Sequence, residues 1–371
     1  MYAGKLCLAP MVRAGELPTR LLALKHGCDL VWSPEIIDKK LIKTERSINT
    51  QLKSVDYTLE NGTVVFRTVP TLEQGKLVFQ MGSADPQLAV QAALKVVQDV
   101  DGIDLNAGCP KHFSIHSGMG AALLSTPDLL CSILTQLVEK VGTPHDKPIS
   151  VKIRLLPERT DTLSLVRRLC TTGVKNITVH CRTREMRNRE HPIRDYLLDI
   201  YNICHQNDVS LIINGMIKDR SHFNTLRDTL SLPSDVGAMI AEAAEANPTV
   251  FHEREPIKQW WDVMNQYIDI AMTYDNNFGN TKYMLSRIIP GKSPMFQYVA
   301  RCKDYDQLKY VQKCINIEDG TVLEDPSPFL AQNSNKNNSK QKKKKRPLDD
   351  TTTNKNKKDE GDGTQPKKLK P

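Results

Sequence analysis

The sequence predicts an α/β fold: a (β/α)8 TIM barrel, followed by a small all-α helical domain and a disordered, Lys-rich tail. Up to residue 247, short apolar runs alternate with helical segments. The runs are almost continuously apolar, which is typical of strands buried on both faces of a parallel sheet. From residue 248 to 325 only helical periodicity remains. From residue 326 to 371 apolar residues nearly vanish, and such a segment cannot bury enough surface to fold.

Eight apolar runs are the candidate barrel strands, at residues 5–11, 30–36, 76–82, 102–109, 149–155, 176–182, 210–216 and 238–244. Helical stretches lie between several of them, at residues 87–99, 126–141, 161–172 and 193–206. Eight strand–helix units in about 240 residues match the count and length of a (β/α)8 barrel. The alternative, a doubly wound sheet, requires a Gly-rich dinucleotide turn after an early strand, and this sequence has none.

Two other patterns complete the expected elements. Residues 55–70 carry Asn61-Gly62 between alternating segments, which predicts a β-hairpin inserted between the second and third barrel strands. Beyond the barrel, four helical segments predict a small bundle, at residues 257–274, 281–288, 293–302 and 305–317.

The positive charge of the chain is unevenly distributed. The 371 residues include 51 Lys+Arg and 43 Asp+Glu, a formal net charge of +8. Residues 331–371 hold 13 of the basic and 5 of the acidic residues, whereas the first 330 residues hold 38 of each. We therefore expect a neutral body with a basic tail. No run approaches the roughly 18 apolar residues of a membrane-spanning helix, so we do not expect a membrane protein.

The nine cysteines are scattered and include no C-x-x-C pair. This spacing indicates neither a disulfide framework nor a zinc site, so we expect no metal and a reducing compartment, cytoplasm or nucleus. Within the tail, Lys342–Arg346 followed by Pro347 is typical of a nuclear-import signal.

Functional side chains of such barrels gather where the strands end. Polar residues stand there in every predicted unit: Met11 and Arg13, Glu35, Gln80, Asn106 and Cys109, Lys152 and Arg154, His180 and Arg182, Asn214 and Gly215, and Glu242. A polar group in an apolar strand costs free energy unless it has a partner. A bound polar ligand is one explanation, and an internal hydrogen bond is the alternative for any single residue.

Cys109 is the candidate reactive residue. It stands in the segment Asn106–Lys111 (NAGCPK) at the end of the fourth strand, where glycine and proline predict a tight exposed turn and Lys111 adds positive charge. A thiol in that place can act as a nucleophile or as a general acid, and the sequence leaves both roles open.

Seven segments carry a family resemblance: residues 8–13 (LAPMVR), 79–82 (FQMG), 102–110 (GIDLNAGCP), 117–124 (SGMGAALL), 151–154 (VKIR), 178–182 (TVHCR) and 214–215 (NG). The chain resembles the tRNA-dihydrouridine synthases, flavin enzymes that reduce a uridine of the tRNA D-loop, from about residue 5 to about residue 317. Residues 34–38 (PEIID) and 280–283 (NTKY) are similar to the eukaryotic branch of that family, which modifies uridine 20.

The resemblance implies an FMN site. Pro10, Met11 and Val12 would line one face of the isoalloxazine, and Gln80 would lie on its polar edge. Lys152 would lie near the N1/O2 edge and His180 on the flavin or phosphate side. The phosphate would be held around Asn214, Gly215, Met216, Ala241 and Glu242. Glu242 departs from the family pattern, because an arginine is common at this position.

The resemblance also implies the reaction: the C5–C6 bond of uracil is reduced with electrons from NADPH or NADH, and Cys109 is the general acid. Asn106, Lys111 and Arg154 would contact the substrate. We further expect tRNA as the partner, a monomeric protein, and a location in cytoplasm and nucleus. Two alternatives remain: a barrel flavoenzyme that acts on a small pyrimidine, and a non-catalytic RNA-binding protein.

Overall fold

The computed structural model describes residues 1–253 and 257–331. Residues 1–326 form one compact unit, which includes both the barrel and the helices that follow it. The described part of the second unit, residues 327–331, is a short helical segment. The predicted tail, 326–371, therefore lies almost entirely outside the described residues, and the predicted boundary between residues 247 and 248 stays a prediction.

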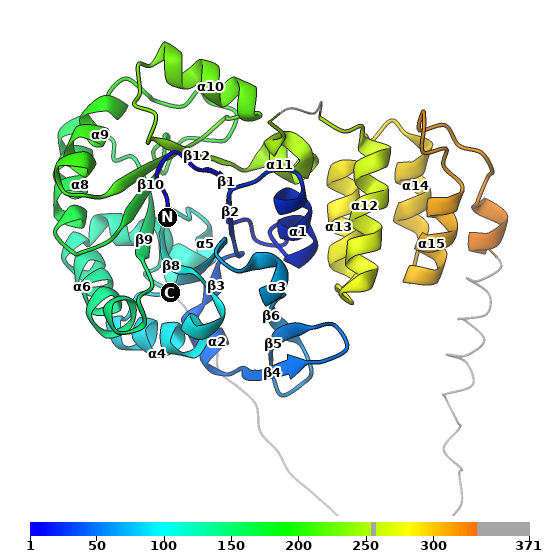
Figure 1. Ribbon diagram of the computed structural model, residues 1–371, viewed down its shortest axis with the longest axis horizontal. Helices are drawn as coiled ribbons and strands as arrows, with labels where there is room; N and C mark the ends of the chain where they lie inside the picture. Colours follow the sequence, from blue (N-terminus) through cyan, green and yellow to red (C-terminus); the bar gives the residue numbers. More distant parts are fainter. Residues whose placement is uncertain (254–256, 332–371) are drawn as a thin grey trace, which may run out of the picture. The chain divides into compact units, whose positions relative to one another are not determined.

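Within residues 1–253, eight parallel strands close into a barrel (Figure 1). They are β1 (Leu6–Leu8), β2 (Leu30–Trp32), β7 (Leu77–Gly82), β8 (Gly102–Ala107), β9 (Ile149–Arg154), β10 (Asn176–His180), β11 (Ser210–Asn214) and β12 (Gly237–Ile240). The strand order is β2-β1-β12-β11-β10-β9-β8-β7, and pairing of β2 with β7 closes the ring. The short β3 (Ile36–Ile37) pairs with the end of β7. The predicted barrel and all eight predicted strands are confirmed.

Helices cover the outside of the barrel, where Figure 1 shows α4, α6, α8 and α9 around the sheet. Their bounds are α1 (Leu17–Lys25), α2 (Asp38–Ile42), α3 (Pro70–Glu73), α4 (Pro86–Val96), α5 (His112–His116), α6 (Pro127–Leu137), α7 (Thr143–His145), α8 (Arg159–Cys170), α9 (Leu197–Gln206), α10 (Arg220–Thr229) and α11 (Glu242–Ala246). The start of α4 illustrates the local signals: Asp85 caps the helix by accepting hydrogen bonds from the backbone N–H groups of Gln87 and Leu88.

An antiparallel sheet of three strands is inserted between β2 and β7: β4 (Glu45–Asn49), β5 (Ser54–Thr58) and β6 (Val64–Thr68). The hairpin of β5 and β6 is the predicted one. The sequence did not predict β4, because it is an outer strand with no buried residue and its segment, ERSIN, has a single apolar side chain.

After the barrel come α12 (Trp260–Thr273), α13 (Phe278–Ile288), α14 (Pro294–Arg301) and α15 (Tyr305–Lys313), as predicted. Helix α12 packs against α1, and α13 packs against α11. Among the helices of the described residues, none has the length and apolar character needed to cross a membrane.

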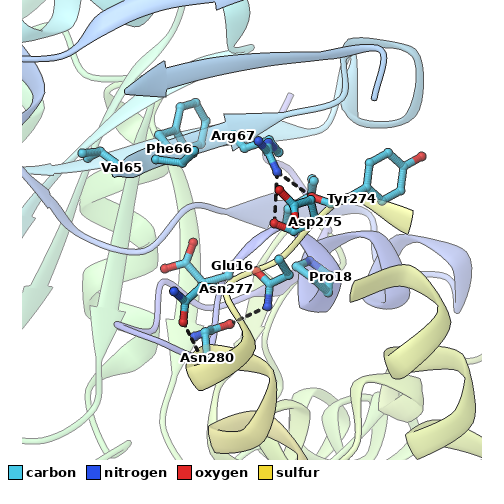
Figure 2. A pocket seen from close by; sticks show the side chains of 12 residues that line it. Glu16, Pro18, Val65, Phe66, Arg67, Tyr274, Asp275, Asn277 and Asn280 are labelled. Carbon is cyan, nitrogen blue, oxygen red and sulfur yellow. Dashed lines mark hydrogen bonds between the residues drawn. The ribbon is translucent and has the colours of Figure 1, made fainter. Parts of the chain in front are cut away.

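The inserted sheet also contacts the helical segment. Arg67 of β6 forms an ion pair with Asp56, 2.6 Å from Nη2 to Oδ2, and donates to the backbone carbonyl of Tyr274 at 2.5 Å. Figure 2 shows Arg67 directed at the Tyr274–Asp275 turn, above a small cavity that Glu16 and Asn280 also line. The inserted sheet thereby joins the barrel to α12 and α13.

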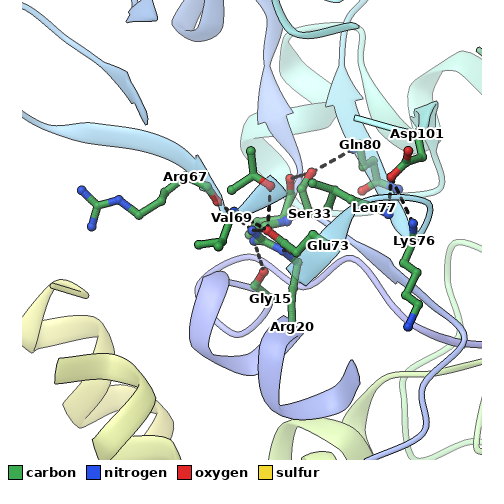
Figure 3. A network of polar contacts seen from close by, with 12 residues as sticks. Gly15, Arg20, Ser33, Arg67, Val69, Glu73, Lys76, Leu77, Gln80 and Asp101 are labelled. Atoms are coloured by element: carbon green, nitrogen blue, oxygen red, sulfur yellow. Dashed lines mark hydrogen bonds and ion pairs between the residues drawn. The ribbon is translucent and has the colours of Figure 1, made fainter. Parts of the chain in front are cut away.

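A buried ion pair fixes α1 on the barrel (Figure 3). Arg20 of α1 and Glu73 of α3 are 0% and 1% exposed, and Nε of Arg20 lies 2.7 Å from Oε1 of Glu73. Arg20 also donates to the carbonyls of Gly15 and Arg67, while Thr68 donates to Glu73. Because every charge in this network has hydrogen-bonding partners, it is held in a defined arrangement.

Candidate active site

A cavity of about 330 Å³ opens at the carboxyl ends of the barrel strands. Twelve of the sequence-predicted site residues line it: Pro10, Met11, Val12, Gln80, Asn106, Cys109, Lys111, Lys152, Arg154, His180, Asn214 and Ala241. Three others, Gly215, Met216 and Glu242, are not among its lining residues. Met216 is 39% exposed, and the Glu242 side chain is exposed as well.

The loop that carries Cys109 is held by side chains beneath it. The amide oxygen of Asn106 accepts hydrogen bonds from the backbone N–H groups of Gly108 and Cys109, at 2.9 and 3.0 Å. Arg154, 6% exposed, donates through Nε to the carbonyl of Gly108 at 2.9 Å. Gly120 has a φ of +59°, and a Cβ there would lie 2.7 Å from the Cys109 carbonyl, so only glycine fits. These contacts fix the position of the thiol.

The thiol itself is half-buried and favours its protonated form. Burial raises the pKa of Cys109, and the neighbouring carboxylate of Glu35 raises it further. A neutral thiol at the opening of a polar pocket is suited to donate a proton.

Lys152 and Gln80 form the floor of the pocket. Desolvation lowers the pKa of Lys152 to about 8, and the nearby Arg154 contributes. Its ammonium donates to the amide oxygen of Asn214 at 3.1 Å. Gln80 donates to Asp104 at 2.8 Å, and burial raises the pKa of this carboxyl to about 6. Lys152 and Gln80 thus have internal hydrogen-bonding partners and also line the cavity.

Neutral His180 stands among cations at one end of the pocket. Burial and the charges of Lys152, Arg154 and Arg182 lower its pKa to about 2. Its Nε2 accepts a hydrogen bond from Arg182 at 3.1 Å. Nearby, Arg194 donates through Nη2 to the carbonyl of Gly215 at 2.7 Å, while its buried Nε has no partner within the described residues. This concentration of positive charge suits an anion.

The structure adds residues that the sequence had not assigned to the site: Asn188, Glu245 and Tyr283 also line the cavity. The Tyr283 hydroxyl of α13 donates to Glu245 of α11 at 2.6 Å, and the Arg13 guanidinium lies 4.0 Å from the Tyr283 ring centroid. These contacts join segments far apart in the chain, so no local pattern could identify them. Glu35, which the sequence had placed at a strand end without a role, lines the cavity too.

A family model and two relatives with known names agree with the resemblance. The family model described as dihydrouridine synthase matches residues 7–321. The tRNA-dihydrouridine(20) synthase [NAD(P)+] of Saccharomyces cerevisiae is 61% identical over 339 residues, 89% of this chain and 88% of that protein. The protein of the same name from Schizosaccharomyces pombe is 47% identical over 313 residues, 83% of this chain and 64% of that protein. A variant of NCR from Zymomonas mobilis matches at a TM-score of 0.46 and 12% identity, over 71% of this chain and 90% of that chain.

Proposed function

The chain belongs to the dihydrouridine synthase family, and from this premise we propose that it reduces uridine 20 of tRNA to dihydrouridine with FMN and NAD(P)H. The observation that carries the proposal is the Cys109 thiol. It is held in its neutral form at the opening of a pocket that twelve of the predicted site residues line.

The pocket fits FMN. The buried Nε of Arg194 has no partner within the described residues, and the charge of Arg182 lies beside neutral His180, an arrangement that suits a phosphate. Glu242 is exposed and lies off the cavity. Arg182 and Arg194 do not line the cavity either, so they would act on the phosphate through His180 and Gly215, to which they donate hydrogen bonds. Lys152 would face the N1/O2 edge of the ring, Gln80 its polar edge, and Pro10, Met11 and Val12 one of its faces. Asn214, Gly215, Met216 and Ala241 would contribute at the phosphate end. When bound, FMN would supply the hydride for C6 of uracil, with NADPH or NADH as the source of its electrons.

Cys109 donates the proton of the reaction. Its S–H bond breaks as a C–H bond forms at uracil C5. Asn106 and Arg154 hold the loop so that the thiol keeps its position between turnovers. The amide oxygen of Asn106 binds its own loop. The other part of this amide would contact the uracil, together with Lys111. The target base must leave the tRNA stack to reach this depth.

The protein acts as a monomer in this proposal, and the helical segment contributes to tRNA binding. Tyr283 of α13 supports this arrangement, because it lines the cavity and bonds to the barrel residue Glu245. The substrate therefore meets the barrel opening and the helical segment together.

Substitution of Cys109 by alanine tests the function. We expect Cys109→Ala to form dihydrouridine at least about a hundredfold more slowly than the wild type, since a general acid contributes about 10²–10⁴-fold. The measurement is mass spectrometry of tRNA from a strain that lacks the enzyme, after incubation with purified protein and NADPH. FMN absorbance should be retained.

Cys131→Ala is the matched control, because Cys131 is also a partly buried thiol but lies on α6 and does not line the cavity. It should react at the wild-type rate. Wild-type turnover by Cys109→Ala would refute the acid role, and reduction of free uridine as fast as tRNA would favour a small-molecule enzyme.

A further inference from the structure

Glu35 is a buried carboxylate that the reaction above does not use. It lies between β2 and β3 and lines the same cavity as Cys109. Both of its oxygens are buried, and neither accepts a hydrogen bond within the described residues. A buried carboxylate without partners costs free energy, so its presence calls for an explanation.

Room is provided for this carboxylate. Oε1 of Glu35 lies 2.6 Å from the place that a Cβ of Gly82 would occupy, so the missing side chain at the end of β7 leaves space for it. The Cys109 thiol and the Asn106 amide lie near enough to influence the pKa of Glu35, although neither forms a regular hydrogen bond to it. The carboxylate is therefore placed beside the thiol and is free to act on it.

Three cations act on Cys109 from the other directions. Lys111 belongs to the same loop, and Lys152 and Arg154 come from β9. Positive charges stabilise a thiolate, as in the reactive cysteines of many enzymes. A thiolate has no proton to donate. The positive charges that suit an anionic cofactor and substrate therefore oppose the role of Cys109 as a general acid, because they favour loss of its proton.

We propose that Glu35 is a positioning residue whose negative charge keeps Cys109 in the neutral thiol form. This rests on the proposed role of Cys109 as proton donor. Burial raises the pKa of the Glu35 carboxyl and also that of the Cys109 thiol. Because an ordinary carboxyl group ionises near pH 4 and a thiol near pH 8.5, the carboxyl still loses its proton first. The resulting charge then opposes ionisation of the thiol.

The same charge favours recovery of the thiol after each turnover. When Cys109 has given its proton to C5, a thiolate remains beside the Glu35 carboxylate. The thiolate takes a proton from the solvent, which re-forms the S–H bond and relieves the repulsion, and the hydroxide left behind is neutralised by the buffer. Glu35 itself exchanges no proton in this step. Its effect on the pKa of Cys109, second only to burial, agrees with this role.

The test is the pH dependence of Cys109 alkylation by iodoacetamide in the full-length holoenzyme without tRNA, followed by mass spectrometry of the Cys109 peptide. Only the thiolate reacts. In Glu35→Gln, which keeps the shape and removes the charge, we expect the thiol pKa to fall by about one unit and alkylation at pH 7 to be about tenfold faster. Glu35→Asp keeps the negative charge but has a side chain one methylene shorter, so the carboxylate lies further from the thiol. We therefore expect a smaller fall in the thiol pKa.

Ser114→Ala is the matched control. The Ser114 hydroxyl is also buried and lies close enough to Cys109 to influence its pKa, although it forms no regular hydrogen bond within the described residues, and it has no charge. Its loss should not lower the thiol pKa. An unchanged thiol pKa in Glu35→Gln, or an equal fall in Ser114→Ala, would overturn the proposal.

Alkylation requires no turnover, so failure of the proposed function would appear separately, as absent dihydrouridine formation by the wild type. In an active enzyme, the high-pH decline of kcat should begin about one unit lower in Glu35→Gln.

Discussion

At the scale of single residues, Lys152 shows how the site trades stability for function. Its pKa is about 8 in the fold, against about 10.4 in an unfolded chain. The charged lysine therefore destabilises the fold below pH 8, and this cost disappears as the pH rises from about 8 to 10.4. We expect Lys152→Met to raise the Tm of FMN-free protein at pH 7 by a few degrees and to weaken FMN binding. Calorimetry at pH 7 and pH 10 provides the check, and a gain in Tm that is no smaller at pH 10 would contradict the argument.

Single residues also show how far the sequence predicts the site. Cys109, Lys152 and His180 were predictable because they lie at or near the carboxyl ends of strands, and these ends must meet in a parallel barrel. Tyr283 was not, since its place in the cavity depends on how α13 packs against α11. The burial of Glu35 was not predictable either, because it depends on the space that Gly82 leaves.

At the scale of elements, one buried ion pair holds α1 and α3 together. Glu73→Gln leaves the Arg20 guanidinium, which is 0% exposed, without its counter-ion. We expect a loss of about 3 kcal/mol in the free energy of unfolding, measured by urea denaturation. Asp199→Asn is the control, because its pair with Arg159 is 42% and 58% exposed and should contribute less than about 1 kcal/mol. Equal losses in the two variants would show that burial does not determine how much these ion pairs contribute to the free energy of unfolding.

The elements differ in how well their sequences predicted them. The eight barrel strands are buried on both faces, so their sequences are mostly apolar, apart from the polar side chains that line the cavity or have internal partners. The antiparallel hairpin of β5 and β6 was indicated by its Asn61-Gly62 turn. Strand β4 has neither signal and forms only by pairing with β5. A strand with no buried residue carries little trace of its structure in its sequence.

At the scale of the whole molecule, the net positive charge lies in the last 41 residues, and the rest of the chain has no net charge. The first 330 residues carry 38 basic and 38 acidic side chains, and residues 331–371, nearly all outside the described part, carry a net charge of +8. We propose that the barrel opening recognises the uridine specifically, and that the tail adds attraction to phosphates that is independent of sequence and sensitive to salt. We also propose that the tail directs part of the protein population to the nucleus, while the other molecules stay in the cytoplasm.

Removal of residues 331–371 separates these two contributions. We expect the truncated protein to keep its kcat at saturating tRNA, because the side chains assigned to the reaction all belong to the described part of residues 1–326. Its tRNA affinity should fall at low salt and approach that of the full chain at high salt. Each lost phosphate contact should reduce the slope of log K against log salt by about 0.7–0.9.

Replacing Lys342–Lys345 with glutamine in the full chain should reproduce part of the change. Filter binding across a salt series measures the tRNA affinity and its salt dependence. An unchanged slope would contradict the role of the tail. The electrostatic attraction would then come from the cations of the barrel opening and α13.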